Sequence, residues 1–538
     1  MRDSSSSSAA SFPAAVPPSE RMSNVDAAWL RMEELENQMT ITAVLTFSAP
    51  LSRADVRRVV EERLLAFDRF RQRVRRGGAF RHPRWAPDPH FDLDHHVRAA
   101  ELPAPGGKAE LQELASRLMS RPLDFSRPLW TFHVVEGYRD EGSAVIARLH
   151  HCIADGVTLV RVLLSLTDAT PEAPPGGAPG EDMADALLGV GARSEADETP
   201  SWTQRLTSAL KRAGRTSAQL ARGVARGAGV LGKLAWPSTD PDTVFRGELG
   251  RRKNAVWSDA LPLDDVKAIG RTLGGTVNDV LLTTVTGALG RYLERHGQRA
   301  PGLDVRAAVP VNLRPLTDAP LQMGNGFGLV FLALPVGTRD PVERLRLLRR
   351  RMDRLKSSPE APILLGVLAA VGGTTRSVED PIVRFLARKL TAVATNVPGP
   401  RQTLYLAGAP LETLMAWVPQ AGRVGLGVSV ISYDGDVRLG LATDAGLVSD
   451  PDTLIDAFYR EFDALRSRLP GRPDEEDSGA EAGDEAGDED AGDGGAVMQP
   501  SPAAQDSPDR CQATTKAGTQ CKLPAQDDAR FCHVHENG

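Results

Sequence analysis

Seven consecutive residues near position 150 combine side chains that can move a proton. They are His150-His151-Cys152-Ile153-Ala154-Asp155-Gly156. A neutral imidazole is the natural general base near pH 7. No serine, metal or cofactor motif accompanies this pair, so the chemistry open to it is simple. One base can remove the proton of a hydroxyl that attacks an already activated acyl group, such as a thioester. The motif therefore favours acyl transfer.

The elements around the motif decide where its side chains point. Residues 143–151 have the pattern of a strand, and 156–168 have the pattern of a helix. Alternation along the strand places His151 and His150 on opposite faces. We expect one histidine to face a cleft and the other to pack inside or orient its neighbour. Asp155 in the turn is expected to pair with an arginine, and Gly156 leaves room for close approach.

Other interpretations of the motif are weaker. His95 and His96 are also adjacent, but no Asp-Gly follows them at the same spacing. A shared metal ion is disfavoured, because neighbouring strand residues point to opposite faces. Cys152 as a nucleophile that carries the acyl group stays open as an alternative. A small residue in a packed turn is the favoured interpretation of Cys152.

The composition excludes several classes of protein. Of the 538 residues, 41% are hydrophobic and 25% are charged, which excludes a wholly disordered or fibrous chain. The longest uncharged apolar stretch, 361–373, is too short to span a membrane. The first twenty residues lack the apolar core of a signal peptide, and four cysteines make no disulfide framework. We expect a soluble cytoplasmic protein whose membrane contact is peripheral.

Composition also divides the chain into six parts. We expect a disordered start, a first α/β block that holds the motif, a linker with a basic amphipathic crossover, a second α/β block, an acidic disordered tether and a small tail module; these are residues 1–21, 22–168, 169–253, 254–469, 470–509 and 510–538. The acidic run 474–493 holds eleven acidic residues and no basic one, so the rest has a formal net charge of +5.

The apolar periodicity predicts particular elements within the two blocks. A helix at 27–36 has Asn24 or Asp26 as its expected cap, and a longer helix is expected over 51–74. A β-hairpin is expected to turn at Asp434-Gly435. The crossover segment 202–234 has seven basic residues and no acidic one. It is expected either to lie on an anionic membrane surface or to be a solvated helix.

HHxxxDG resembles the active-site motif of the CoA-dependent acyltransferase superfamily. Three further segments resemble motifs of the bacterial wax ester synthase/diacylglycerol acyltransferase family. RPLDFSRPLW (121–130) resembles its PLW motif, TVNDVLL (276–282) its NDVxL motif, and ATNVPGP (394–400) its NVPGP segment, with Thr395 where serine is usual. The resemblance extends over about residues 22–468 of the chain.

The resemblance implies two chloramphenicol-acetyltransferase-like α/β domains with a channel between them. It implies transfer of a long-chain fatty acyl group from acyl-CoA to diacylglycerol or a long-chain alcohol, without a catalytic cofactor. His151 would be the general base and His150 its supporting neighbour, while Asp155 and Gly156 shape the turn. Contact with the inner face of the membrane or with lipid droplets would be peripheral, and no nucleic acid is expected as a partner.

The resemblance also suggests substrate-binding residues. Pro128, Leu129 and Trp130 would lie near the acyl-entry side. Asn278 and Asp279 would act structurally or help to close the channel, and Asp279 at a helix start is expected to be a cap. The apolar segments 323–337 and 361–373 are candidates for the lining of an acyl tunnel, or for ordinary core. No residue stands out as a donor to the oxyanion.

The tail carries a separate pattern. Cys511, Cys521, Cys532 and His535 are spaced as three thiolates and one imidazole for a tetrahedral zinc site. The segment is too small to fold on a core alone, and zinc binding would supply its folding energy. His533 is the rival fourth ligand. This end is not part of the acyltransferase pattern, and its partner is unknown.

The sequence alone leaves other functions open. Acyl transfer to a polyketide-derived diol would use the same chemistry as transfer to a fatty alcohol. Condensation on a carrier protein is less expected, because no carrier or adenylation segment lies in the chain. A non-catalytic lipid- or CoA-binding adaptor would have no use for the base in HHxxxDG.

Overall fold

The computed structural model describes most of the predicted α/β blocks. The described residues are 19–76, 81–172, 239–313, 323–356, 358–420 and 422–470. The basic crossover 202–234, the acidic tether and the Cys3His tail all lie outside these residues. No helix in the described part has both the length and the apolar character that a bilayer crossing requires.

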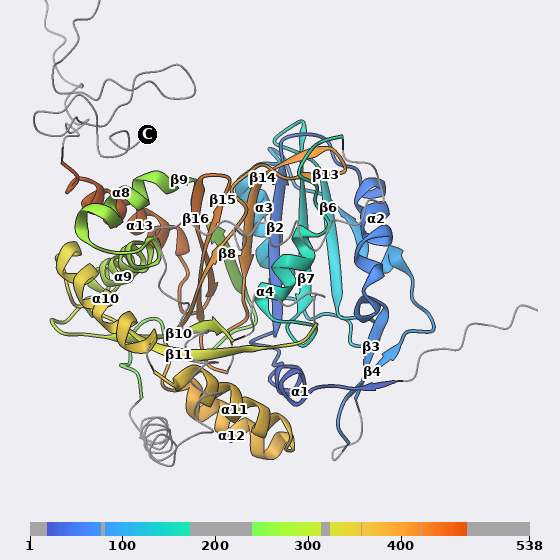
Figure 1. Ribbon diagram of the computed structural model, residues 1–538, viewed down its shortest axis with the longest axis horizontal. Helices are drawn as coiled ribbons and strands as arrows, with labels where there is room; N and C mark the ends of the chain where they lie inside the picture. The colour runs from blue at the N-terminus through green and yellow to red at the C-terminus, as the bar shows by residue number, and fades with distance from the viewer. Residues whose placement is uncertain are drawn as a thin grey trace, which may run out of the picture. The chain divides into compact units, whose positions relative to one another are not determined.

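Two mixed sheets form the frame of the molecule and stand side by side in Figure 1. The first sheet has the order β13 (Tyr405–Leu406), β14 (Ala409–Trp417), β2 (Thr40–Phe47), β7 (Gly142–His150), β6 (Trp130–Tyr138) and β5 (Val97–Ala100). The second has the order β11 (Phe327–Leu334), β10 (Val305–Asn312), β12 (Ala392–Pro398), β15 (Leu426–Tyr433), β16 (Asp436–Asp444) and β8 (Lys253–Trp257), with β9 (Leu261–Pro262) paired to β16. The predicted α/β class is confirmed.

Helices cover the sheets. In Figure 1 the second sheet is flanked by α8 (Leu263–Leu273), α9 (Val277–Arg295), α10 (Pro341–Lys356) and α13 (Pro451–Arg466). The first sheet carries α2 (Arg53–Glu62), α3 (Lys108–Met119) and α4 (Gly156–Leu164). A three-stranded sheet is formed by β1 (Glu20–Arg21), β4 (Arg84–Pro87) and β3 (Gln72–Arg75). Next to β11 lie α1 (Asn24–Arg31), α11 (Glu360–Gly372) and α12 (Arg376–Ala387).

The two halves of the chain exchange structure. β13 and β14 come from the second half of the sequence, yet β14 pairs with β2 and completes the first sheet. In the other direction, the first half supplies Ser116 of α3 and Ser120 directly after it. Their hydroxyls accept hydrogen bonds from the backbone of β8 at 2.8 and 2.9 Å. These contacts satisfy backbone groups of the edge strand β8, which would otherwise be open.

Local signals explain where several elements begin. Thr276 caps α9, and Asp279 returns the hydrogen bond in a capping box, as expected of a cap. The β15–β16 hairpin turns at Asp434-Gly435 as predicted, and both residues have positive φ, the signature of a tight hairpin turn. Asn24 and Asp26 were expected as caps of the first helix, but the cap is Ser23.

The helix predicted over 51–74 is wrong in its second half. α2 ends at Glu62, and two short 3₁₀ turns lead into β3. Val74 lies opposite Trp85 in the β3–β4 pair, and both side chains are buried. The apolar residues do recur at helical spacing, but the pairing of β3 with β4, which lies outside the predicted helix, determined the structure.

Candidate functional site

The predicted motif sits at the end of a central strand. His150 is the last residue of β7 and pairs with Thr40 of β2. The chain then turns, and the His151 amide donates to the Met39 carbonyl oxygen at 2.7 Å. Asp155 caps α4 through its Oδ1, which accepts a hydrogen bond from the Thr158 amide at 2.9 Å. Strand, turn and helix cap together fix the positions of both histidines.

His151 lies among aromatic rings. Its side chain is 3% exposed. The imidazole stacks on Trp29 with ring centres 4.3 Å apart, and Phe327 lies 5.4 Å away. Burial lowers the pKa of His151 from 6.5 to about 4, although the nearby Asp155 carboxylate opposes the shift. The imidazole is therefore neutral at pH 7 and can accept a proton.

His150 has a different environment. It is fully buried, and its Nδ1 accepts a hydrogen bond from the Cys152 amide at 3.1 Å. In a neutral ring, the proton must then be on Nε2, which lies 3.4 Å from a Glu33 carboxylate oxygen. The same Glu33 oxygen accepts a hydrogen bond from the Met39 amide at 2.5 Å. The turn backbone therefore fixes the orientation of His150, and the Glu33 carboxylate lies close to its Nε2.

Asp155 was expected to pair with an arginine. Within the described residues this prediction is wrong. Asp155 Oδ2 accepts a hydrogen bond from the Gly326 amide at 3.0 Å instead. Backbone amides satisfy both carboxylate oxygens, one in α4 and one in the second half of the chain. Beside this bond, Ala154 and Gly324 form an isolated parallel β-bridge. Asp155 thus joins the turn to residues 323–326 rather than to an arginine.

Asn325 adds a further contact to the motif, and together with the Asp155–Gly326 hydrogen bond it forms what we call the clamp. Its side-chain Nδ2 donates to the His151 carbonyl oxygen at 2.8 Å and to Asp26 Oδ1 at 2.7 Å. Asp26 is buried in α1, and burial raises its pKa. Three segments far apart in the sequence therefore meet at His151: α1, the motif turn and residues 323–326.

Two cavities of opposite character flank the histidines. The first is lined by apolar residues alone and lies between β11, α11 and α12. Trp29 and Phe327 form part of its wall and also contact His151. The second has a volume of about 710 Å³ and includes five arginines in its wall. Glu33 and Phe125, which contact His150, also line this second cavity.

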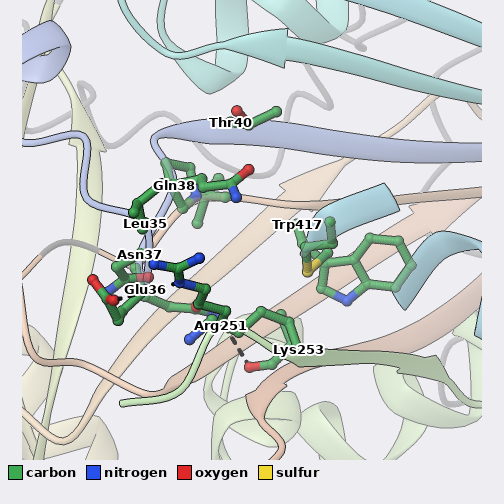
Figure 2. A pocket seen from close by; sticks show the side chains of 13 residues that line it. Leu35, Glu36, Asn37, Gln38, Thr40, Arg251, Lys253 and Trp417 are labelled. Carbon is green, nitrogen blue, oxygen red and sulfur yellow. Dashed lines mark hydrogen bonds and ion pairs between the residues drawn. The ribbon is translucent and has the colours of Figure 1, made fainter. Parts of the chain in front are cut away.

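A smaller polar crevice lies between the two sheets, as Figure 2 shows. Thr40 and Trp417 line it from the first sheet, and Lys253 lines it from the second. Lys253 Nζ is paired with Asp444 at 2.7 Å, and both side chains are buried. The hydroxyl of Thr40 and the indole nitrogen of Trp417 have no hydrogen-bond partner within the described residues. Thr40 pairs with His150, so this crevice reaches the same end of β7.

The residues of the PLW segment are buried. The Leu129 carbonyl oxygen accepts a hydrogen bond from the His150 amide at 2.9 Å. The Trp130 indole donates to the Phe70 carbonyl oxygen at 2.8 Å and stacks on His96. Pro128 is buried beside them. The three residues support β6 and the backbone of His150, and their predicted place at an acyl entry stays a prediction.

Asn278 and Asp279 lie elsewhere in the second half. Asp279 caps α9. The Asn278 side-chain oxygen accepts a hydrogen bond from Asn396 Nδ2 at 2.9 Å, which links the NDVxL and NVPGP segments. Both asparagines and Thr395 line a cavity of about 280 Å³ on α9, β10 and β12. This wall is separate from the apolar pocket beside His151.

The remaining predictions concern Cys152, Gly156 and the metal ligands. Cys152 is fully buried, and burial raises the pKa of its thiol well above 9, which argues against a thiolate nucleophile. Gly156 has Val418 at ordinary contact distance from where a Cβ would stand. The described residues contain no cluster of metal-binding side chains. The predicted ligands Cys511, Cys521, Cys532 and His535 lie outside the described part of the chain.

Sequence reasoning missed Trp29, Glu33 and Asn325. Each contacts a histidine of the motif from a distant part of the chain. Asn325 carries a local signal, since it lies between two glycines directly before β11. Trp29 and Glu33 carry none, because a tryptophan and a glutamate around the end of a helix are ordinary.

Comparison with known proteins places the chain among relatives. A model described as the wax ester synthase/diacylglycerol acyltransferase catalytic domain matches residues 22–281, and the family's C-terminal domain model matches 323–466. Two proteins of Mycobacterium tuberculosis, both provisionally named diacylglycerol O-acyltransferase, are each 30% identical to this chain. The first match covers 85% of this chain and 92% of the relative, and the second, tgs1, covers 80% and 93%.

Solved structures share the fold. A wax ester synthase/diacylglycerol acyltransferase from Marinobacter aquaeolei VT8 matches with a TM-score of 0.61 at 21% identity, over 84% of this chain and 99% of that one. The first condensation domain of the CDA synthetase matches with a TM-score of 0.52 at 16% identity, over 85% and 98%. Family models, relatives and fold agree: the chain belongs to the wax ester synthase/diacylglycerol acyltransferase family and is an acyltransferase.

Proposed function

We propose that this protein transfers a long-chain acyl group from acyl-CoA to the hydroxyl of diacylglycerol or of a long-chain alcohol, with His151 as the general base. The observation that carries the proposal is the position of His151. A neutral imidazole, on a turn held by backbone hydrogen bonds, adjoins an apolar pocket. Its neighbour His150 adjoins a large charged cavity.

The chemistry needs one base and no covalent enzyme intermediate. His151 takes the proton of the acceptor hydroxyl while that oxygen attacks the thioester carbon. The tetrahedral intermediate then expels the CoA thiolate, which takes the proton back from the imidazolium. The products are one ester and one free CoA thiol. Burial favours the neutral form of His151 before the reaction, and the Asp155 charge favours the imidazolium during it.

The apolar pocket supports a place for an alkyl chain. Two segments that were candidates for a tunnel lining meet there: β11 supplies Phe327, Leu329 and Phe331, and α11 supplies Leu364 and Leu368. α11 is apolar around its whole circumference, yet several of its side chains are only half-buried. A helix of this kind is normally covered on all sides. An alkyl chain in the pocket would bury more of that surface.

Free CoA release tests the proposal. Purified protein is incubated with hexadecanoyl-CoA and, in separate reactions, diacylglycerol and hexadecanol, and the thiol is followed with a colorimetric reagent. Acceptor-dependent release that disappears in His151→Ala would support the proposal and rank the two acceptors. Folded protein that releases no CoA with either acceptor would contradict it, and would favour a specialised diol acceptor or a binding role.

Peripheral membrane contact belongs to the same proposal, because the acceptor is dissolved in lipid. The predicted docking segment 202–234 lies outside the described residues. Within them, α12 supports contact: Val378 and Phe385 lie on its outer face and are 48% and 37% exposed. Arg384 and Arg388 are exposed on the flank of that face. The opposite face of the helix lines the apolar pocket with Val383 and Ala387.

A vesicle assay tests the role of α12. The double variant Val378→Ser/Phe385→Ser should reduce flotation with phosphatidylglycerol-containing vesicles by several-fold, since two apolar side chains can no longer insert. Activity on a short, soluble alcohol should be unchanged. Equal flotation of the variant and the parent protein would exclude α12 as the contact.

The tail remains a proposal from its sequence spacing. We propose that Cys511, Cys521, Cys532 and His535 bind one zinc ion. Metal analysis of the purified chain should give about one zinc per chain, and Cys521→Ser should remove it. Retention of zinc in a His535→Ala variant and its loss in His533→Ala would reassign the fourth ligand.

A further inference from the structure

The cavity on the His150 side is unusually rich in arginine. Its wall is formed by β1, the end of α1, the β3–β4 hairpin, the segment before β6 and the turn between α11 and α12. The basic side chains in this wall are those of Arg21, Arg31, Arg76, Arg81, Arg376 and His82. Among the described residues of the wall, two are acidic, Glu33 and Glu34. We call this space the arginine cavity.

The arginines are not equally engaged. Arg31 is paired with buried Glu379 at 2.6 Å, and Arg376 lies 3.4 Å from Asp380. Arg21, Arg76 and Arg81 have no ion pair or side-chain hydrogen bond within the described residues. Three exposed arginines with free donors therefore line one cavity, where their charges raise the local concentration of anions.

The acidic residues of the wall do not offset these charges. Glu33 is engaged by the Met39 amide and faces His150. Glu34 lies 4.0 Å from Arg384 of α12. His82 contacts the Met22 carbonyl oxygen through Nε2, and burial lowers its pKa, so it adds no charge at pH 7. The cavity keeps a positive balance, which comes from arginine alone.

The cavity also reaches the reaction centre. The Arg76 guanidinium lies over the Phe125 ring at 4.2 Å, and the edge of Phe125 meets His150 with ring centres 5.6 Å apart. A group bound between Arg76 and Arg81 would thus be separated from the histidine pair by one layer of side chains. An arginine cluster on a remote face would lack this connection and would be an ordinary solvated surface.

We propose that the arginine cavity binds phosphate groups, with the phosphates of acyl-CoA as the expected ligand. Guanidinium groups recognise phosphate by paired hydrogen bonds, and they keep their charge at all relevant pH values. CoA carries its phosphates at the end remote from the thioester, so anchoring them would deliver the reactive end toward the histidines. This inference rests on the proposed acyl transfer. Phosphate of a lipid headgroup has the same chemistry and is separated from CoA by the test.

The test compares thioesters with and without phosphates. The variant is Arg76→Gln/Arg81→Gln, and the matched control is Arg75→Gln, an exposed arginine of β3 outside the cavity wall. We measure KM for hexanoyl-CoA and for hexanoyl-N-acetylcysteamine with a short alcohol in the absence of membranes. The double variant should raise KM for hexanoyl-CoA by about tenfold or more, as expected for loss of charged hydrogen bonds. Its KM for the phosphate-free thioester and its kcat should stay unchanged.

A binding measurement separates this inference from the proposed function. Calorimetry with 3′,5′-adenosine diphosphate needs no turnover, so weaker binding in the double variant supports the phosphate site even if no acceptor is found. Arg21→Gln, at the opposite wall, repeats the test if the hairpin variant fails to fold. Sedimentation with phosphatidylglycerol vesicles forms the lipid arm. A loss confined to vesicle binding would assign the phosphate site to lipid headgroups.

Two results would overturn the proposal. If the double variant behaves like Arg75→Gln in all three measurements, the arginines are ordinary solvated charges. If KM rises equally for both thioesters, the substitutions have damaged the site and phosphate is not what the arginines recognise.

Discussion

The two histidines of the motif are neighbours in sequence, yet they lie in opposite surroundings. His151 stacks on Trp29 beside a pocket with an entirely apolar lining. His150 is held by the Cys152 amide and lies near Glu33, beside a cavity that contains five arginines. The end of a strand makes this possible, because successive side chains point to opposite faces. One imidazole is left to accept a proton, and the other is fixed in place.

The largest expected effect is on the apolar side. His151→Ala should lower kcat by about 10³-fold, within the range for loss of a general base. The measurement is acceptor-dependent CoA release, with folding checked by circular dichroism. The exposed His95, which pairs with Asp92 on the surface, provides the matched control His95→Ala. Similar activity of the two variants would remove His151 from the reaction.

The turn that carries His151 should be the next most sensitive. In Asp155→Asn, an amide nitrogen or oxygen must replace each carboxylate oxygen, so one of the two backbone amides at Thr158 and Gly326 loses its acceptor. We expect a loss of about 1–3 kcal/mol in the free energy of unfolding, and a fall in kcat of about tenfold or more. Denaturant titration and steady-state rates measure the two effects. Unchanged values for both would show that the clamp is unnecessary.

Glu33→Gln probes the His150 side. The glutamine oxygen can still accept from the Met39 amide, but the negative charge beside His150 is lost. We expect kcat to fall by about tenfold, equal to about 1.4 kcal/mol in the barrier, with KM unchanged. Glu33→Asp, which keeps the charge, should recover part of the rate. A rise in KM alone would instead indicate a role for Glu33 in substrate binding within the arginine cavity.

The pH dependence should reflect the burial of His151. Because its folded pKa is about 4 rather than 6.5, the base stays neutral well below pH 6.5, and the acid limb of kcat/KM should lie below that value. Between these two pH values the unfolded chain binds a proton that the folded chain does not, so the free energy of unfolding should fall as the pH drops from 6.5. A rate profile with a midpoint near 6.5 would contradict the burial of the base.

The smallest expected effect concerns chain length. Val383→Phe places a larger side chain in the wall of the apolar pocket and reduces the space in it, whereas Val383→Ala enlarges that space. The first variant should lower the rate ratio of hexadecanoyl-CoA to butanoyl-CoA by about fivefold, a modest overpacking effect of about 1 kcal/mol. The second should leave the ratio unchanged or raise it. Parallel changes in the two variants would show that the pocket does not receive the alkyl chain.

Much of the site could be predicted from local sequence. HHxxxDG at a strand-to-helix turn, the hairpin at Asp434-Gly435 and the capping box of Asp279 all depend on residues within a few positions of one another. The helix expected over 51–74 was wrong for the opposite reason. The end of this stretch forms β3 and pairs with β4, which lies outside residues 51–74. This pairing outweighed the helical spacing of the apolar residues.

The family, the α/β class and the candidate base could be inferred before the fold was known, because motif spacing and hydrophobic periodicity are properties of the linear chain. The surroundings of that base, in contrast, depend on the three-dimensional packing. Asn325 reaches the His151 carbonyl across 174 residues, and β14 of the second half completes the first sheet beside β2. The physical reason is that burial, and with it the low pKa of His151, arises from packing between distant segments.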